Sequence, residues 1–265
     1  NFITNVLKLV SGSVTAQILG ILLIPIITRI YNPDDFGIFQ LFISISGILV
    51  IVSTFSYQLA IMLPKTEEDA ANITSVCVVL VTLISILTGV VVLFIPEDIN
   101  IFNTPGISKY LPLLPVIIFL NGMFFVQNYW LSRKTRFGVI AGSRVSNTLT
   151  SKISQIGLAK MSVTPFGLIG GYIAGYAFAD IVMLKGVKKD IQIFKKVSVK
   201  RMKEVVIQYK KFPLFSFWSS IANTISPQVP AFLLAYFYST AVVGHFSLAN
   251  QVVNLPMGIV CGARS

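Results

Sequence analysis

The chain has 265 residues, of which 54% are hydrophobic and only 12% are charged, and its mean hydropathy is +0.80. Soluble domains carry about 25% charged residues, so this composition excludes a water-soluble globular protein and makes lipid the expected surrounding. The net charge of +11 would suit nucleic acid, but ten of the 21 Lys and Arg fall between Lys185 and Lys211, next to apolar segments. Basic residues there set membrane topology and contact anionic lipids, so we predict no nucleic-acid partner.

Eight apolar runs divide the chain, and their lengths suit helices that cross a bilayer. In chain order they are Leu7–Ile30, Phe36–Leu63, Ile73–Ile95, Tyr110–Leu131, Val139–Met161, Phe166–Leu184, Phe212–Tyr238 and Val242–Gly262. The predicted fold class is all-α, a polytopic bundle of transmembrane helices. We expect a first six-helix bundle in 1–184, a basic cytoplasmic connector in 185–211 with an amphipathic helix near 198–208, and the first two helices of a second bundle in 212–265.

The first run and the turn after it recur about 207 positions later. Tyr31, Gly37 and Phe39 are matched at identical spacing by Tyr238, Gly244 and Phe246. Each copy has the same context: a helix dotted with small polar residues, a proline, an aromatic turn and the next helix. Internal repeats of helix bundles are typical of secondary transporters, so the sequence predicts two related halves, with the chain ending shortly after the second begins.

The distribution of Lys and Arg predicts the orientation in the membrane. Connectors after the second, fourth and sixth runs hold fourteen Lys and Arg, whereas those after the first, third and fifth hold three. The even connectors are therefore expected in the cytoplasm, and the N-terminus with them.

The fifth run carries the most informative polar pattern. Four polar residues lie within about 40° of one line on a helix, and two more flank that stripe. The four are Arg144, Thr148, Ser151 and Gln155, and the flanking pair is Asn147 and Lys152. A cation inside a membrane costs roughly 2.5–3.5 kcal/mol on insertion scales, so we expect Arg144 and Lys152 to face a central cavity and attract an anionic substrate. The alternative is that they snorkel to opposite interfaces.

Helices that begin the two halves combine polar residues with prolines. Gln17 and Pro25 lie in the first run, and Asn223, Pro227 and Pro230 lie in the seventh. Each proline removes a backbone donor and bends a helix, so Pro25, Pro227 and Pro230 are predicted hinge positions. Ordinary packing of membrane helices, in which proline is common, is the open alternative.

The sixth run contains glycines at four-residue spacing, Gly167, Gly171 and Gly175, and this pattern predicts close packing on a neighbouring helix. Asp180 is expected near the cytoplasmic end of this run, so that the central spans contain no acidic residue. The sequence contains no His/Cys metal cluster, P-loop or Gly-x-Ser-x-Gly elbow, and we predict no enzyme, no metal site and no cofactor.

Several stretches resemble the Wzx-type flippases of the multidrug/oligosaccharidyl-lipid/polysaccharide exporter superfamily. They are 27–39 (ITRIYNPDDFGIF), 60–65 (AIMLPK) with 69–72 (DAAN), 167–171 (GLIGG) and 249–256 (ANQVVNLP). Members have about twelve to fourteen helices in two related halves, so this chain would be an N-terminal part of about eight. The resemblance implies a transporter of the bacterial cytoplasmic membrane that flips undecaprenyl-pyrophosphate-linked oligosaccharide, an O-antigen, capsule or exopolysaccharide unit used in lipopolysaccharide or other polysaccharide biosynthesis. It also implies a cation-lined cavity, which Arg144 fits best.

The flippase function implied by the resemblance predicts a role for each polar residue. Arg144 and Lys152 would meet the pyrophosphate, and Asn147, Gln155, Gln17 and Asn223 would hydrogen-bond the sugars. The predicted partners are the lipid-linked oligosaccharide, anionic membrane lipids and other membrane proteins of polysaccharide assembly.

Two alternatives stay open. A cation-coupled multidrug exporter of the same superfamily would need an acidic residue in its cavity. A membrane glycosyltransferase or polysaccharide polymerase would need catalytic carboxylates on a sizeable loop, and the loops other than 185–211 are short.

Overall fold

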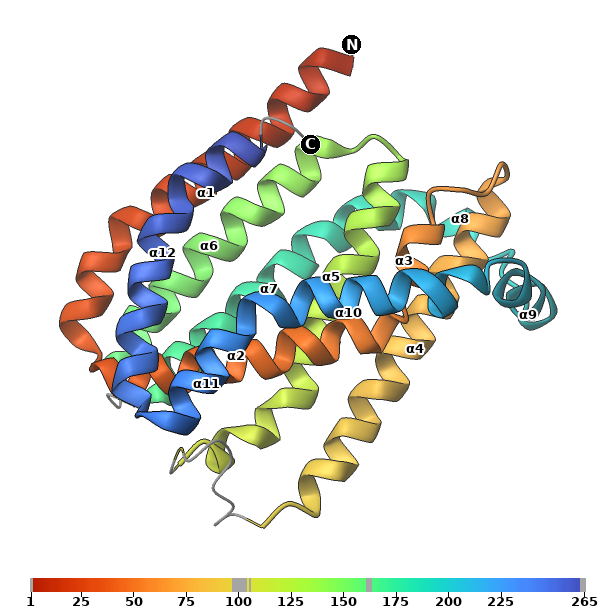
Figure 1. Cartoon of the computed structure of the whole chain (residues 1–265). Helices are drawn as coiled ribbons and strands as arrows, with labels where there is room; N and C mark the ends of the chain where they lie inside the picture. The colour runs from red at the N-terminus through yellow and green to blue at the C-terminus, as the bar shows by residue number, and fades with distance from the viewer. Residues whose placement is uncertain (1, 97–103, 105, 161–163, 263–265) are drawn as a thin grey trace.

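The computed structural model describes residues 2–96, 104, 106–160 and 164–262, and its architecture is all-α, as predicted (Figure 1). The long helices are α1 (Phe2–Ile30), α2 (Pro33–Thr54), α4 (Glu67–Leu93), α5 (Leu114–Arg133), α6 (Phe137–Ala159), α7 (Pro165–Val187) and α12 (Thr240–Gly262). The short elements are α3 (Tyr57–Ala60), η1 (Ser108–Leu113), η2 (Lys188–Asp190), α8 (Ile191–Phe194), α9 (Val199–Gln208), η3 (Phe212–Ser216), α10 (Phe217–Ile225), η4 (Ser226–Gln228) and α11 (Val229–Phe237).

Five helical stretches within the described residues are long and apolar enough to cross a membrane. They are Gly12–Ile30, Pro33–Thr54, Glu67–Leu93, Ser108–Arg133 and Pro165–Phe194. The chain is therefore a multi-pass membrane protein. The fifth predicted run, α6, is absent from this set because its polar stripe lowers its hydropathy, yet it packs between α1 and α7 inside the bundle.

The bundle has two distinct ends. We call the end that carries the connector 185–211 the basic end, and the end where α1 turns into α2 and α11 into α12 the opposite end (Figure 1). At the basic end, α9 docks on α4. Val205 of α9 is buried, the Ser198 backbone N–H donates to Asn72 Oδ1 at 3.1 Å, and Arg201 pairs with Asp69 at 2.7 Å. The amphipathic helix predicted at 198–208 is thus confirmed as α9.

The second predicted run is not one helix. It breaks after Thr54, where Phe55 and Ser56 adopt left-handed backbone angles with φ of 47° and 60°. The Ser56 hydroxyl donates to the Ser220 hydroxyl at 3.2 Å, so the break holds a polar contact to α10. The hydrophobic pattern continued through this point and concealed the break.

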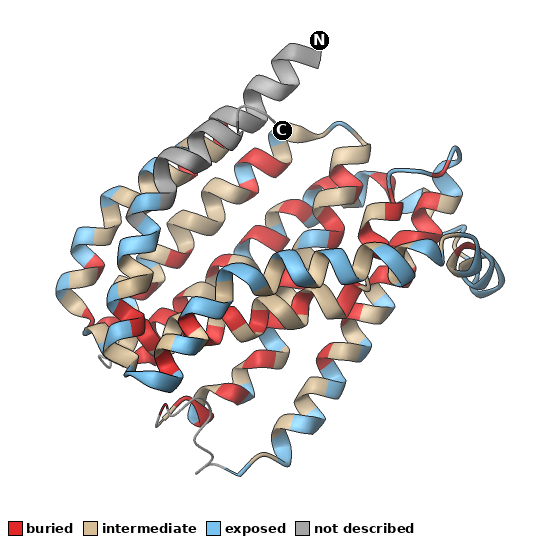
Figure 2. Cartoon of the chain, in the orientation of Figure 1, coloured by how far each residue is buried: buried red, intermediate tan, exposed pale blue. Residues whose placement is uncertain are grey.

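Helix α4 begins earlier than the apolar run it contains. The Thr66 side chain accepts a hydrogen bond from the Asp69 backbone N–H and so caps the helix. The helix therefore begins at Glu67, six residues before the predicted start at Ile73. Toward its far end α4 exposes large apolar side chains, including Leu83 at 57% and Ile86 at 60%, and Figure 2 shows this exposed stretch. That surface suits contact with lipid hydrocarbon.

Glycines of α7 allow α6 to approach closely, as their spacing predicts. A Cβ at Gly171 would overlap Gln155 of α6, and one at Gly175 would overlap Ser151. At the opposite end, Gly167 makes room for the Tyr31 hydroxyl, which donates to the Gln155 carbonyl at 2.6 Å. Three helices, α1, α6 and α7, are therefore held together at this end.

The helices that follow the connector 185–211 pack against α2. Helix α12 crosses α2 where Gly37 faces Thr240 and Gly244 faces Pro33, with no room for a Cβ at either glycine. These two glycines are the pair matched by the sequence repeat. The Thr240 hydroxyl adds a hydrogen bond to Asp34 Oδ1 at 2.6 Å, so the repeat-related turns meet at the opposite end.

Candidate functional site

A polar cavity lies inside the bundle around Arg144. It has a volume of about 270 Å³, is open on one side and is lined by side chains of four helices, α1, α5, α6 and α7. Its lining residues are Ser13, Ala16, Gln17, Phe124, Arg144, Asn147, Thr148 and Tyr176. Nη1 of Arg144 donates to the Ser13 hydroxyl at 2.6 Å, so the guanidinium points across the cavity to α1.

A second polar cavity, of about 260 Å³, continues along the same groove between α1 and α6. Gln17 and Thr148 line both cavities, and Lys152 faces the second, where Gln251 of α12 closes the wall. Side chains from before and after the connector 185–211 therefore line this cavity. The structure brings Arg144, Asn147, Lys152 and Gln17 into one continuous polar groove.

Uncompensated positive charge is the main electrostatic feature of this groove. Among the residues that the structure describes, no carboxylate pairs with Arg144 or Lys152. Both side chains are partly covered by neighbouring helices, and the Oε1 atom of Gln17 beside them is buried without a hydrogen-bond partner. Two cations with spare donors and no fixed anion form a site that attracts a mobile anion such as a phosphate.

Two predicted sugar contacts lie elsewhere. Gln155 is buried between α6 and α7, where its Nε2 donates to the Leu168 carbonyl at 3.2 Å, and it lines neither cavity. Ser151 of the same stripe also faces α7. Asn223 is exposed on α10, outside both cavities. The stripe on α6 therefore has two functions, because its first half faces the groove and its second half faces a neighbouring helix.

The predicted hinge positions differ in their local structure. Pro25 lies inside the continuous helix α1. Pro227 lies in the 3-10 turn η4, and Pro230 lies in the first turn of α11, so the seventh predicted run is interrupted where the prolines occur. A π-helical turn, η3, opens the same run. A segment with several helical pitches is more easily bent than a uniform helix.

Asp180 corrects the expectation that the bundle interior has no acid. It is only 6% exposed and lies about two turns before the end of α7, since the helix continues to Val187. Gln127 Nε2 of α5 donates to its Oδ1 at 3.2 Å. Sequence reasoning ended the helix early and so placed Asp180 too near the interface. It lines neither polar cavity.

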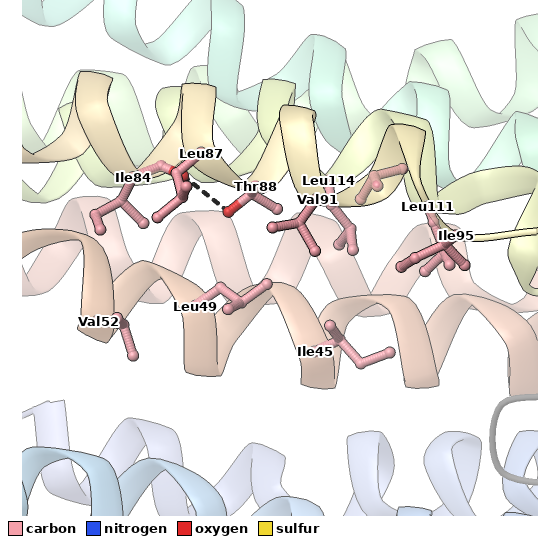
Figure 3. A pocket seen from close by; sticks show the side chains of 11 residues that line it. Ile45, Leu49, Val52, Ile84, Leu87, Thr88, Val91, Ile95, Leu111 and Leu114 are labelled. Atoms are coloured by element: carbon pink, nitrogen blue, oxygen red, sulfur yellow. Dashed lines mark hydrogen bonds between the residues drawn. The ribbon is translucent and has the colours of Figure 1, made fainter.

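An apolar groove lies on another face, between α2, α4 and η1, with a volume of about 470 Å³ (Figure 3). Figure 3 shows Ile45, Leu49, Leu87 and Val91 along it. Its polar member, Thr88, donates its hydroxyl to the Ile84 carbonyl at 2.8 Å. With its one side-chain hydroxyl satisfied, the groove suits hydrocarbon and not sugar or phosphate.

Comparison with known proteins identifies one matching protein family. The model of a family described as polysaccharide biosynthesis protein matches residues 26–263. No curated protein and no solved structure matches the chain. The match agrees with the resemblance to Wzx-type flippases that the sequence motifs indicate. It covers the groove residues of α5, α6, α7 and α12, whereas those of α1 precede residue 26. The chain therefore belongs to the polysaccharide biosynthesis protein family.

Proposed function

We propose that this chain is part of a flippase that moves undecaprenyl-pyrophosphate-linked oligosaccharide across the bacterial cytoplasmic membrane by alternating access. The observation that carries the proposal is the groove between α1 and α6, where Arg144 and Lys152 lie inside a membrane bundle without an anionic partner among the described residues. The cost of burying cations is offset when a pyrophosphate binds between them.

Each part of such a substrate has a matching surface. The pyrophosphate would sit between Arg144 and Lys152, and Asn147 and Gln17 would donate hydrogen bonds to it or to the first sugar. Gln17, whose buried Oε1 has no hydrogen-bond partner, suits a sugar hydroxyl, whereas the exposed apolar surface of α4 suits the hydrocarbon tail. The chain would thus carry the polar part inside and leave the tail in the bilayer.

The orientation and the moving parts belong to the same proposal. The basic end would lie in the cytoplasm because positive charge is retained there, and thiol labelling of a cysteine placed at the exposed Lys189 would show this. The opposite end is closed by the contact between α2 and α12, and the interrupted α10–α11 segment would bend when that contact opens.

The multidrug exporter is the second candidate, because Asp180 provides a buried acid. A cationic drug would need that acid in the binding groove. Asp180 lines neither polar cavity, and the groove presents Arg144 and Lys152 instead. The charge of the groove therefore favours an anionic substrate.

A complementation experiment tests the proposal. In a strain without its own flippase, the full-length protein with Arg144→Ala is expected to insert normally but to lose surface glycan, with lipid-linked oligosaccharide accumulating on the inner leaflet. Arg144→Lys should retain part of the activity because the charge stays. Lys160→Ala, an exposed cation at the end of the same helix, is the matched control and should behave as wild type.

The accumulated intermediate separates transport from synthesis. A transferase or polymerase variant would fail to make or extend the lipid-linked sugar, so loss of the intermediate itself would point to an enzyme. Normal glycan display by Arg144→Ala would contradict the role of the groove, and drug efflux without a glycan phenotype would favour the exporter.

A further inference from the structure

Two buried aspartates, one inside α7 and one in the turn η2 that follows it, have opposite surroundings. Asp190 is paired with Arg136 at 2.7 Å and accepts a hydrogen bond from Trp130 Nε1 at 3.0 Å. Asp180, about three turns earlier, is equally buried but has no ion pair among the described residues. Its Oδ1 accepts from Gln127, and its Oδ2 has no hydrogen-bond partner.

A carboxylate buried without a cation costs several kcal/mol, so the neutral acid is the stable form in this surrounding. Gln127 can serve both forms. Its Nε2 donates to an ionised Asp180, and a half-turn of the amide would let its Oε1, which has no partner in the structure, accept from a protonated Asp180. The pair therefore holds a donor and an acceptor for one exchangeable proton.

The site is close to the polar groove along the helices. Tyr176, one turn before Asp180 on α7, lines the cavity with Arg144. Gly175 packs on Asn147 and Ser151, and Gly186 packs on Val139, so the turn of α7 that carries Asp180 lies beside the turn of α6 that carries Arg144. A change of charge at Asp180 would therefore alter the electrostatic potential at the anion site around Arg144.

Few other ionisable groups lie at this depth. Helix α2 carries its charges, Asp34 and Asp35, only at the opposite end. Helix α5 has Arg133 at the basic end, where it binds the carbonyls of Ile61 and Pro64. Among the described residues of α7 and the helices packed against it, the remaining ionisable groups near Asp180 are Tyr172 and Tyr176 of α7, Tyr129 of α5 and Arg144 of α6.

We propose that Asp180 and Gln127 form a proton-binding site that is coupled to anion binding at Arg144. This inference rests on the proposed function for its anion. A proton from water binds at Oδ2 of Asp180 and removes a negative charge from the interior, which strengthens the attraction of the groove for pyrophosphate. Release of that proton restores the negative charge of Asp180 and weakens binding of the anion. Binding of the proton and binding of the anionic substrate therefore favour each other.

The proton site can be observed without transport. Infrared difference spectra of the full-length protein in lipid nanodiscs, taken between acidic and alkaline buffer, are expected to show the carbonyl stretch of a protonated carboxyl that titrates. Asp180→Asn should remove this band, and Glu204→Gln, which changes an exposed acid of α9, should leave it. Gln127→Leu should move the titration to higher pH, because the hydrogen bond lost by the ionised form is charge-assisted and therefore stronger than the one lost by the protonated form.

Binding of inorganic pyrophosphate to the same nanodiscs tests the coupling. At each pH, the affinity of wild type for pyrophosphate is divided by the affinity of Asp180→Asn, which lacks the titrating group, so that the ionisation of pyrophosphate itself cancels. This ratio is expected to be roughly 5-fold or more higher in acidic than in alkaline buffer. Asp180→Asn should match wild type in acidic buffer, where Asp180 is protonated, and should bind pyrophosphate more tightly than wild type in alkaline buffer.

Three outcomes would overturn the inference. They are a carboxyl band that persists in Asp180→Asn, a band that responds to sodium and not to pH, and a ratio of wild-type to Asp180→Asn affinity that is the same in acidic and alkaline buffer. A protein that shows the Asp180 band but binds no pyrophosphate would contradict the anion site and the coupling while upholding the proton site, so the two failures are distinguishable.

Discussion

At the scale of single residues, the environment of each charged side chain decides what it does. Arg136 and Asp190 satisfy each other at the basic end, where Arg136 also donates to the Gly186 carbonyl at 2.6 Å. Arg144 has the same chemistry as Arg136 but has Ser13 as its partner and a cavity beside it. A paired arginine stabilises the fold, whereas one without a fixed anion can bind a mobile one.

The Asp190 network gives a prediction about stability. Asp190→Asn keeps the shape of the side chain but removes the charge that holds Arg136 and weakens the acceptor of Trp130 Nε1. We expect it to destabilise the protein by about 1–3 kcal/mol, the usual range for a buried polar partner left unsatisfied. Thermal unfolding in detergent measures this. Lys188→Ala, an exposed neighbour in the same turn, should unfold as wild type, and equal stability of the two variants would contradict the assigned role.

At the scale of helices, the glycines repeated in the sequence, Gly37 and Gly244, allow α2 and α12 to cross at close distance. Gly37 and Gly244 each lie against the backbone of the other helix, so a side chain at either position would separate the helices. Gly37→Ala or Gly244→Ala is expected to cost about 1–3 kcal/mol through overpacking. Gly47→Ala in the same α2 is the matched control, because nothing lies near its Cβ position.

The Gly47→Ala control should be as stable as wild type or more so, since alanine is the better helix former by roughly 1 kcal/mol. Unfolding temperatures of the three purified variants give the comparison. If Gly37→Ala and Gly244→Ala unfold together with Gly47→Ala, the close crossing is not needed for stability.

Most helices could be predicted from the sequence because long apolar runs with polar ends leave little choice in a membrane. The break at Phe55 and Ser56 could not, since backbone angles chosen by a contact to α10 leave no mark on hydrophobicity. The early start of α4 could have been found from the Thr66 cap, which is a recognisable local signal.

The polar groove could be predicted only in part. Arg144 and Lys152 stood out because cations are costly in lipid, and the structure places both in the groove. Gln155 lies on the same stripe but faces α7, because which neighbour a helix face meets depends on packing between segments far apart in the chain. Asp180 was misplaced for the simpler reason that helix ends are read poorly from composition.

At the scale of the whole molecule, helices from before and after the basic connector meet at the opposite end through repeat-related turns. The hydrogen bond between Thr240 and Asp34 lies on this seam, next to the glycine crossing. Among the helices before the connector, by contrast, the ends of α4 and α5 are joined at the basic end by the ion pair of Glu67 with Lys134. Alternating access requires the first contact to open and allows the second to persist.

Crosslinking therefore separates the moving seam from the fixed one. With the native cysteines replaced by serine, a cysteine pair at Asp34 and Thr240 joined by a short thiol reagent should arrest flipping of lipid-linked oligosaccharide in proteoliposomes, and a reducible reagent should allow recovery on reduction. The same reagent on a pair at Glu67 and Lys134 should leave flipping intact, because under the proposed mechanism the helices before the connector move together and this ion pair persists. Full transport by the crosslinked Asp34 and Thr240 pair would mean that this end never opens, and the groove would then need an exit within the first half, between α1 and α6.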